Sequence, residues 1–167
     1  MPEKRTIERA RKDKREGKSP STQAGEFVRE EIHHVREGKH GARSAKQAIA
    51  IGLAKARRQG VKLPPPEKGE APAATRRKAA KDVAAGRRPK KTVPRKRSRA
   101  THRALEHEGH SAASHTALSK QARTAAKRRT ASERSAAAKK AARTKGPAKR
   151  SAAAKKAART RARHSRH

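Results

Sequence analysis

Large apolar side chains are too few in this chain to build one core of ordinary size. Only 15 of the 167 residues are apolar residues other than alanine, and Phe27 stands alone among Phe, Trp and Tyr. Lys and Arg number 49 against 14 Asp and Glu, which gives a formal net charge of +35. Low hydrophobicity with high net charge leaves too little apolar burial to offset chain entropy. The sequence therefore excludes a single 167-residue core and, with it, most enzyme architectures.

Charge and apolar residues are unevenly distributed along the chain. Residues 1–70 have a net charge of +8 and residues 71–167 one of +27, while nine of the 15 larger apolar residues lie between Phe27 and Leu63. This distribution predicts a mostly α-helical protein with extensive disorder. Four parts are expected along it: a small helical unit at 1–63, a Pro-rich basic disordered linker at 64–100, a second short helical segment at 101–130 and an Ala/Lys/Arg repeat tail at 131–167.

Local signals predict helices in the first part, as a helical hairpin or a three-helix unit. Three polar residues are expected N-caps: Thr6 for a helix reaching Glu16, Ser19 for one reaching about Glu37, and Ser44 for one reaching Arg58. Glycines follow each expected end, at Gly17, Gly38 and Gly60. Because so small a core is marginal by itself, homodimerisation through residues 20–63 is an expectation.

The C-terminal part combines a short helical segment with an exact repeat. A helix from Arg103 to Glu108 and a second one capped by Ser111 are predicted. The eleven residues 134–144 recur letter for letter at 150–160, and Gly146-Pro147 between the copies should break any helix. Alanine favours helix, but like charges crowded within a turn oppose it. We expect a disordered tail that gains helix when phosphates neutralise it.

The basic segments predict binding to a polyanion, because dense Lys and Arg bind duplex phosphates through counterion release. Without Trp or Tyr there is no stacking platform for single strands, so duplex DNA is the expected partner. RNA is the alternative ligand. A further hypothesis is that the protein is a protein-interaction adaptor acting through residues 20–63. The expected phosphate contacts are Arg87, Arg88, Lys90, Lys91, Arg95, Lys96, Arg97, Lys127, Arg128, Arg129, Lys139, Lys140, Arg143, Lys155, Lys156 and Arg159.

Signals of catalysis are missing from the sequence. There is no Cys, no Gly-rich phosphate loop and no nucleophile elbow. Glu30 with His33, and Glu31 with His34, have the Glu-x-x-His spacing that carboxylate-bridged metal sites use twice. No second copy of that motif is evident, so a solvated helix face is predicted here. A non-enzymatic protein with no catalytic residue, no metal and no cofactor is therefore expected.

Apolar runs are also too short for a membrane span, and the N-terminus lacks the apolar segment of a signal peptide. These observations favour a cytoplasmic, nucleoid-associated protein without a membrane partner.

Residues 6–63 carry distinctive text, from Thr-Ile-Glu-Arg-Ala-Arg-Lys through Ser-Thr-Gln-Ala-Gly-Glu-Phe-Val-Arg-Glu-Glu-Ile to Lys-Gln-Ala-Ile-Ala-Ile-Gly-Leu. This text resembles a family of small bacterial proteins known as a domain of unknown function. The repeats from Arg134 onward resemble the Ala/Lys-rich tails of linker histones and of bacterial histone-like proteins. The tail resemblance implies non-specific DNA binding and compaction, although no winged-helix domain of the linker-histone kind is visible.

Overall fold

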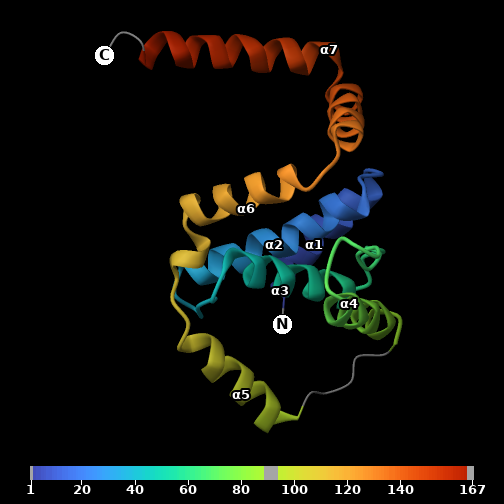
Figure 1. The fold of residues 1–167 in the computed structure, drawn as a ribbon, viewed down its shortest axis with the longest axis vertical. Coiled ribbons are helices and arrows are strands. Elements are labelled where there is room, and N and C mark those ends of the chain that lie inside the picture. Colours follow the sequence, from blue (N-terminus) through green and yellow to red (C-terminus); the bar gives the residue numbers. More distant parts are fainter. Residues whose placement is uncertain (1, 89–93, 165–167) are drawn as a thin grey trace. The chain divides into compact units, whose positions relative to one another are not determined.

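The computed structural model describes residues 2–88 and 94–164, and this part of the chain is mostly helical (Figure 1). It divides into two compact units, Met1–Gln121 and Ala122–His167, called unit 1 and unit 2 below. The predicted α-helical class is confirmed. The elements are α1 (Lys4–Arg15), α2 (Pro20–Arg36), α3 (Ala45–Arg58), α4 (Ala73–Gly86), α5 (Arg95–Glu106), the 3₁₀ helix η1 (Ser111–Ala113), α6 (His115–Lys127) and α7 (Ala131–His164).

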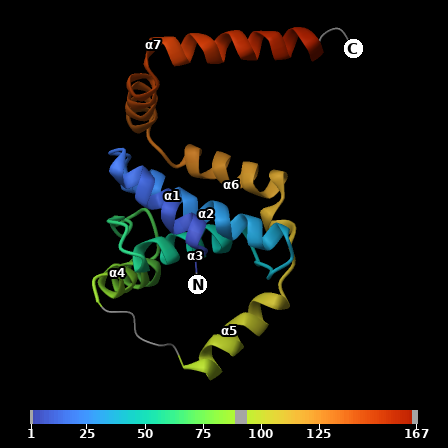
Figure 2. The same ribbon diagram turned by 180° about the vertical axis from the view of Figure 1, so that it is seen from behind.

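Helices α1, α2 and α3 lie side by side in both views of unit 1 (Figures 1 and 2). Ser19 caps α2 by accepting a hydrogen bond from the Thr22 N–H, and Ser44 caps α3 by accepting one from the Gln47 N–H. These two predicted caps are confirmed. The prediction that Thr6 is an N-cap is wrong. Helix α1 begins at Lys4, after its N-cap residue Glu3, so Thr6 lies within the helix, where it is buried.

The core of unit 1 consists of two small clusters. One cluster centres on Phe27, which is 1% exposed, with Ala10, Ala24 and Ala56 around it. The second cluster contains Ile32, Val35, Ala42, Ala48, Ala112 and Ala113. Alanine supplies most of the buried apolar positions, so the backbones of neighbouring helices approach closely. A Cβ at Gly52 in α3 would lie 2.6 Å from the Cα of Val28 in α2, so only glycine fits this crossing without a shift of the backbone.

Residues far along the chain complete this core. The N–H of Gly41 donates to the carbonyl of Leu105 at 2.8 Å, and the N–H of Ala42 donates to that of Gly109 at 3.0 Å. Arg36 donates from Nε to the carbonyl of Ala113 at 2.8 Å. The loop between α2 and α3 is therefore tied to the segment that joins α5 to η1.

The disordered linker expected at residues 64–100 is not supported by the structure. Helix α4 packs against α3, where Arg58 donates to the buried carboxylate of Asp82 at 2.7 Å. Buried Arg57 donates to the carbonyls of Leu63 and Pro64, and burial lowers the pKa of its guanidinium. The alanines of α4 provide helix propensity, and these contacts with α3 hold the helix in place.

The second helical segment differs from its prediction at both ends. Helix α5 begins at Arg95 and ends at Glu106, so it extends further toward the N-terminus than the expected start at Arg103. Ser111 does not cap a long helix, because it opens the short η1, whereas Ser114 Oγ accepts from the Ala117 N–H at the start of α6. Serine is a preferred N-cap residue and stands at both Ser111 and Ser114, so the sequence alone did not show which of the two begins the longer helix.

The tail is helical on both sides of one break. Residues of α7 have helical backbone except at Gly146, whose φ of 67° and ψ of 168° confirm the predicted break before Pro147. Helix α7 begins with a capping box that the sequence reading overlooked, Thr130-x-x-Glu133. The Thr130 N–H donates to the Glu133 carboxylate at 2.7 Å, and the Glu133 N–H donates to Thr130 Oγ1 at 3.2 Å. The disordered tail is therefore not supported; alanine propensity and this cap favour helix.

The Glu133 cap makes the helicity of α7 depend on pH. Hydrogen bonds from Thr130, the backbone one foremost, lower the pKa of Glu133. A carboxylate with a lowered folded pKa stabilises the fold above its unfolded value of about 4.3 and loses this effect as pH falls through the folded value. We expect Glu133→Gln to remove part of the helical signal at 222 nm at neutral pH, and to shrink the loss seen on acidification. Glu8→Gln in α1 is the control, and an equal change there would contradict this account.

Candidate nucleic-acid interface

Unit 2 concentrates positive charge on exposed helix. Its 46 residues contain seventeen Lys or Arg and a single acidic residue, Glu133, whose carboxylate is engaged in the helix cap. Six of the predicted phosphate contacts lie on α7 and all are exposed: Lys139, Lys140, Arg143, Lys155, Lys156 and Arg159. No described side chain of α7 is buried. The cations of unit 2 are therefore accessible to a polyanion.

Each copy of the repeat places three of its four cations on one side of its helix, while its first residue, Arg134 or Arg150, lies on the opposite side. At about 100° per residue, Lys139, Arg143 and Lys140 fall within an arc of about 100°. The alanines 137, 138, 141 and 142 occupy the opposite side. Because the second copy has the same letters, Lys155, Lys156 and Arg159 share one side in the same way. Residues three and four apart on a helix have neighbouring side chains, so each copy presents a compact group of three cations.

Five of the remaining predicted contacts lie at or just after the C-terminal ends of α6 and α4. Lys127 ends α6, and Arg128 and Arg129 follow it, all three exposed. Arg87 is the C-cap residue of α4 and is exposed, as is Arg88. The structure brings Lys127, Arg128 and Arg129 together as one consecutive basic run ahead of α7.

Three more lie in the first turn of α5, and two lie outside the described residues. Arg95, Lys96 and Arg97 are exposed at the start of α5, whose first turn contains no acidic residue. Lys90 and Lys91 fall within residues 89–93, outside the described part of the chain. Cations at a helix N-terminus are unfavourable next to the positive end of the helix dipole, and a bound phosphate there would relieve this repulsion.

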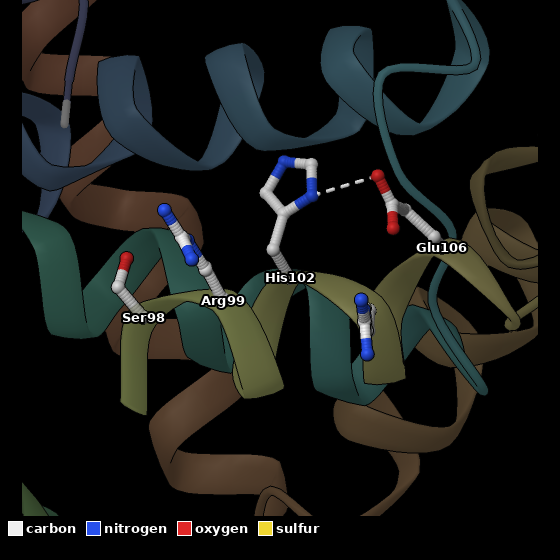
Figure 3. Close-up of a pocket in the computed structure, with 5 residues that line it drawn as sticks. Ser98, Arg99, His102 and Glu106 are labelled. Atoms are coloured by element: carbon white, nitrogen blue, oxygen red, sulfur yellow. Dashed lines mark hydrogen bonds and ion pairs between the residues drawn. The ribbon is translucent and has the colours of Figure 1, made fainter. Parts of the chain in front are cut away.

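A surface pocket on α5 offers no enclosed site. Its lining residues all belong to this one helix, and His102 Nδ1 lies 2.8 Å from the Glu106 carboxylate across it (Figure 3). His102 and Glu106 are both exposed, one turn apart. A hollow between side chains of a single helix does not bury a small ligand in the manner of an enzyme cleft.

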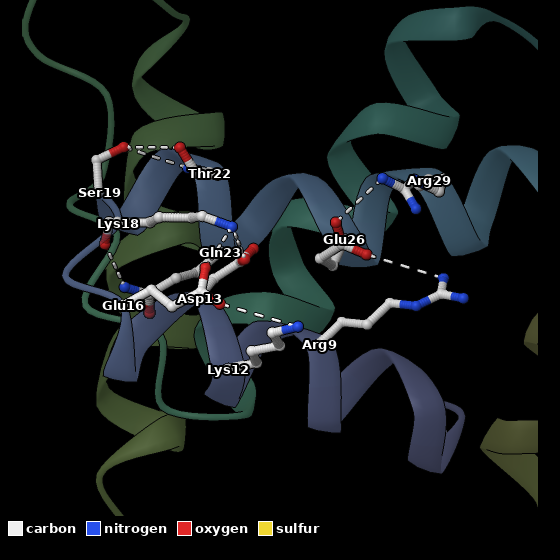
Figure 4. A network of polar contacts seen from close by, with 10 residues as sticks. All are labelled: Arg9, Lys12, Asp13, Glu16, Lys18, Ser19, Thr22, Gln23, Glu26 and Arg29. Atoms are coloured by element: carbon white, nitrogen blue, oxygen red, sulfur yellow. Dashed lines mark hydrogen bonds and ion pairs between the residues drawn. The ribbon is translucent and has the colours of Figure 1, made fainter. Parts of the chain in front are cut away.

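Several cations of unit 1, in contrast, have acidic neighbours. Between α1 and α2, Lys18 lies 2.7 Å from Asp13 and 2.8 Å from Glu16, and these contacts raise the pKa of Lys18 (Figure 4). Glu26 lies between Arg29 at 3.2 Å and Arg9 at 3.9 Å (Figure 4). Exposed pairs of this kind add little stability, but they neutralise cations that would otherwise face solvent. The electrostatic attraction for a polyanion is therefore stronger over unit 2.

The carboxylates of Glu30 and Glu31 contradict the predicted solvated helix face. Both residues are buried, at 6% and 1% exposure. Glu31 pairs with Lys55 of α3 and lies 3.2 Å from His40 Nε2, while Glu30 accepts a hydrogen bond from the Glu3 N–H at 3.1 Å. Burial of a carboxylate requires such compensating partners. All three partners are distant in sequence, so helix periodicity alone did not reveal them.

The N-terminal segment that contains α1, α2 and α3 is similar to a known protein family. Residues 4–68 match a family of unknown function (DUF6496). The resemblance expected for residues 6–63 is thereby confirmed. The DUF6496 segment ends shortly before α4, and the resemblance of the repeats to histone tails stays a prediction. No curated protein and no solved structure matches the chain.

A helix that crosses a bilayer must be long and predominantly apolar. Among the described residues, no helix combines the length and the apolar character that crossing a bilayer requires.

Proposed function

We propose that this protein is a non-enzymatic, histone-like nucleic-acid-binding protein that neutralises and bridges the phosphates of duplex DNA with little sequence preference. The observation that carries the proposal is unit 2, whose sequence has seventeen Lys or Arg against one acidic residue and whose described Lys and Arg side chains are exposed. Cytoplasmic, nucleoid-associated localisation follows from this proposal, because the nucleoid is the largest store of duplex phosphate in a bacterial cell.

The chemistry of the tail supports binding without base reading. Specific readout of bases requires side chains such as Arg, Asn or Gln placed against base edges by a fixed element in a groove. The repeats offer Lys, whose ammonium group is a point charge, Ala, which offers only a methyl group, and two Arg per copy, which lie exposed on the helix surface. Their cations suit phosphate contacts, which fix position on a duplex and carry no sequence information.

Two tail helices joined at Gly146 also support bridging. Each helix carries its own group of three cations, and the break allows them to approach different phosphates. Three-residue cationic groups separated by a helix break are suited to contacts with two duplexes or with two turns of one duplex. The DUF6496 segment contributes α1, α2 and α3 to the packed unit 1, and homodimerisation through residues 20–63 would double the number of tails.

The proposal is tested by the salt dependence of binding. We expect the full chain to bind a labelled duplex of about 30 base pairs with log K falling linearly with log salt, at about 0.9 per phosphate contact. Shuffling the sequence of the duplex should leave the affinity unchanged within a factor of about 3, because each base read specifically would cost about 1–3 kcal/mol when changed. A slope near zero, or a strong preference for one sequence, would overturn the proposal.

RNA is distinguished from DNA in the same assay. Duplex RNA of equal length and charge should compete with labelled DNA, and preference for DNA is expected if the tail follows the wider groove of B-form duplex. Preference for RNA by more than about tenfold (about 1.4 kcal/mol) would favour a ribosome-associated role. Retention of a protein partner by residues 20–63 together with a shallow salt slope would favour an adaptor.

A further inference from the structure

Carboxylates and imidazoles gather at one end of α2, in a chain that is otherwise dominated by positive charge. Glu3, Glu30 and His34 each have a ligand-type atom within 4.8 Å of the others'. Glu3 Oε1 lies 2.9 Å from His34 Nε2, and Glu30 Oε1 lies 3.9 Å from the same nitrogen. Glu30 and His34 are four residues apart, so both project from the same face of α2.

Glu30 is the unusual member of this group. Its side chain is 2% exposed, and its Oε1 accepts the hydrogen bond from the Glu3 N–H. Its second oxygen, Oε2, is buried and meets no donor among the described residues. A buried carboxylate oxygen without a partner is costly. A nearly enclosed carboxylate with one unpartnered oxygen, whose other oxygen lies 3.9 Å from the His34 imidazole, suits a bound cation.

We propose that Glu3, Glu30 and His34 form a binding site for one divalent transition-metal ion such as Zn²⁺. Zinc accepts imidazole nitrogen and carboxylate oxygen at about 2.0–2.2 Å. Tetrahedral coordination at that radius places ligand atoms about 3.4 Å apart, which small side-chain rotations reach from the observed spacing. Two carboxylates and a neutral imidazole supply a charge that matches a divalent cation.

The surroundings of the three residues fit this role. They line a cavity of about 180 Å³ whose wall includes two further carboxylates, Glu26 and Glu37. The ring of His40 meets that of His34 edge to face at 6.0 Å between centroids, which fixes the orientation of the His34 ring. Ligand orientation by such neighbours is typical of metal sites. The Lys39 ammonium lies 3.3 Å from Glu3 and 3.0 Å from Glu37 and is exposed, so it is free to leave Glu3 when a cation binds.

A second grouping, Glu31 with His34 and His40, shares His34 but is a weaker candidate. The carboxylate of Glu31 already pairs with Lys55 on one oxygen and with His40 on the other. A metal ion at Glu31 would have to displace a half-buried ammonium group from α3. In the group with Glu3 the ammonium group to be displaced is that of Lys39, which is exposed, so the structure assigns the ion to this group.

The experiment titrates Zn²⁺ alone into the full chain, freed of metal beforehand, by isothermal titration calorimetry at neutral pH. We expect one tight ion per chain and at least about a tenfold loss of affinity (about 1.4 kcal/mol) for Glu30→Gln and for His34→Ala. His33→Ala is the matched control, because His33 directly precedes His34 on α2, lines the same cavity and is exposed. Its affinity should equal that of the unaltered protein.

Three results would overturn the site. The first is equal affinity of Glu30→Gln and the unaltered chain, the second is as large a loss for His33→Ala as for His34→Ala, and the third is binding of several weak ions that no variant changes. Far-UV circular dichroism verifies folding of each variant. Should Glu30→Gln fail to fold, Glu3→Gln tests the same site from a half-exposed position. Co²⁺ in place of Zn²⁺ gives a second readout, a visible absorption band that the His34→Ala variant should lack.

Discussion

Replacing six tail cations with Gln is expected to remove most of the affinity for duplex DNA. The substitutions are Lys139, Lys140, Arg143, Lys155, Lys156 and Arg159, each to Gln, which retains the helix propensity of Lys. If each cation releases one counterion, the slope of log K against log salt should fall by about 5. This is the largest functional effect that the structure predicts, since these side chains form both exposed cationic groups of α7.

A matched variant separates the site from the overall charge. It carries six exposed cations of unit 1 changed to Gln: Lys4, Arg5, Arg11, Lys14, Lys46 and Lys62. Both variants lower the net charge of the chain by six. We expect the unit 1 variant to keep most of the slope, because a phosphate contact requires a cation at the bound surface. Equal losses in the two variants would mean that the net charge of the chain, and not the tail, governs binding.

Much of the helical arrangement could be predicted from short-range signals. Ser19 before Pro20, and Ser44 before an alanine-rich stretch, are strong helix starts because a side-chain oxygen satisfies the free N–H groups of the first turn. Both begin helices in the structure. The Gly146-Pro147 break was equally visible, because proline removes a backbone donor and clashes with the preceding turn.

Long-range contacts were beyond the sequence. Helix α4 has no apolar periodicity strong enough to predict it, and its position depends on Asp82 meeting Arg58, 24 residues away. The pairing of Gly41 with Leu105 is likewise a backbone contact between distant segments. Composition alone therefore suggested a disordered linker, because it measures how much apolar surface exists and not which polar groups find partners.

The candidate interface and the candidate metal site differ in how much of each the sequence predicts. Exposed cations on an alanine helix follow from the repeat itself, so the phosphate contacts of α7 could be chosen from residue identity and spacing. The group of Glu3, Glu30 and His34 could not, because Glu3 precedes α1 and meets α2 only when the helices pack. Spacing drew attention to Glu30 with His33, whereas packing brought Glu3 to Glu30 and His34.

Phe27→Ala is expected to remove a large fraction of the stability of unit 1. Phe27 is 1% exposed at the centre of one of the two core clusters. Truncation of a buried Phe costs about 3–5 kcal/mol, and a small domain has only about 5–15 kcal/mol in total. Thermal unfolding followed at 222 nm should shift to markedly lower temperature, and amide hydrogen exchange of α2 and α3 should accelerate. Ile51→Ala, at a half-buried position outside both clusters, should cost less than half as much.

The same variant separates the folded unit from the electrostatic binding. Since the proposed phosphate contacts of α7 lie in unit 2, Phe27→Ala should leave the salt slope for duplex DNA nearly unchanged even where α2 and α3 have lost protection. The affinity for duplex DNA then does not depend on the stability of unit 1. A slope that collapses together with the folded state would place the binding surface on unit 1, where packed helices and not the repeats would have to position the cations.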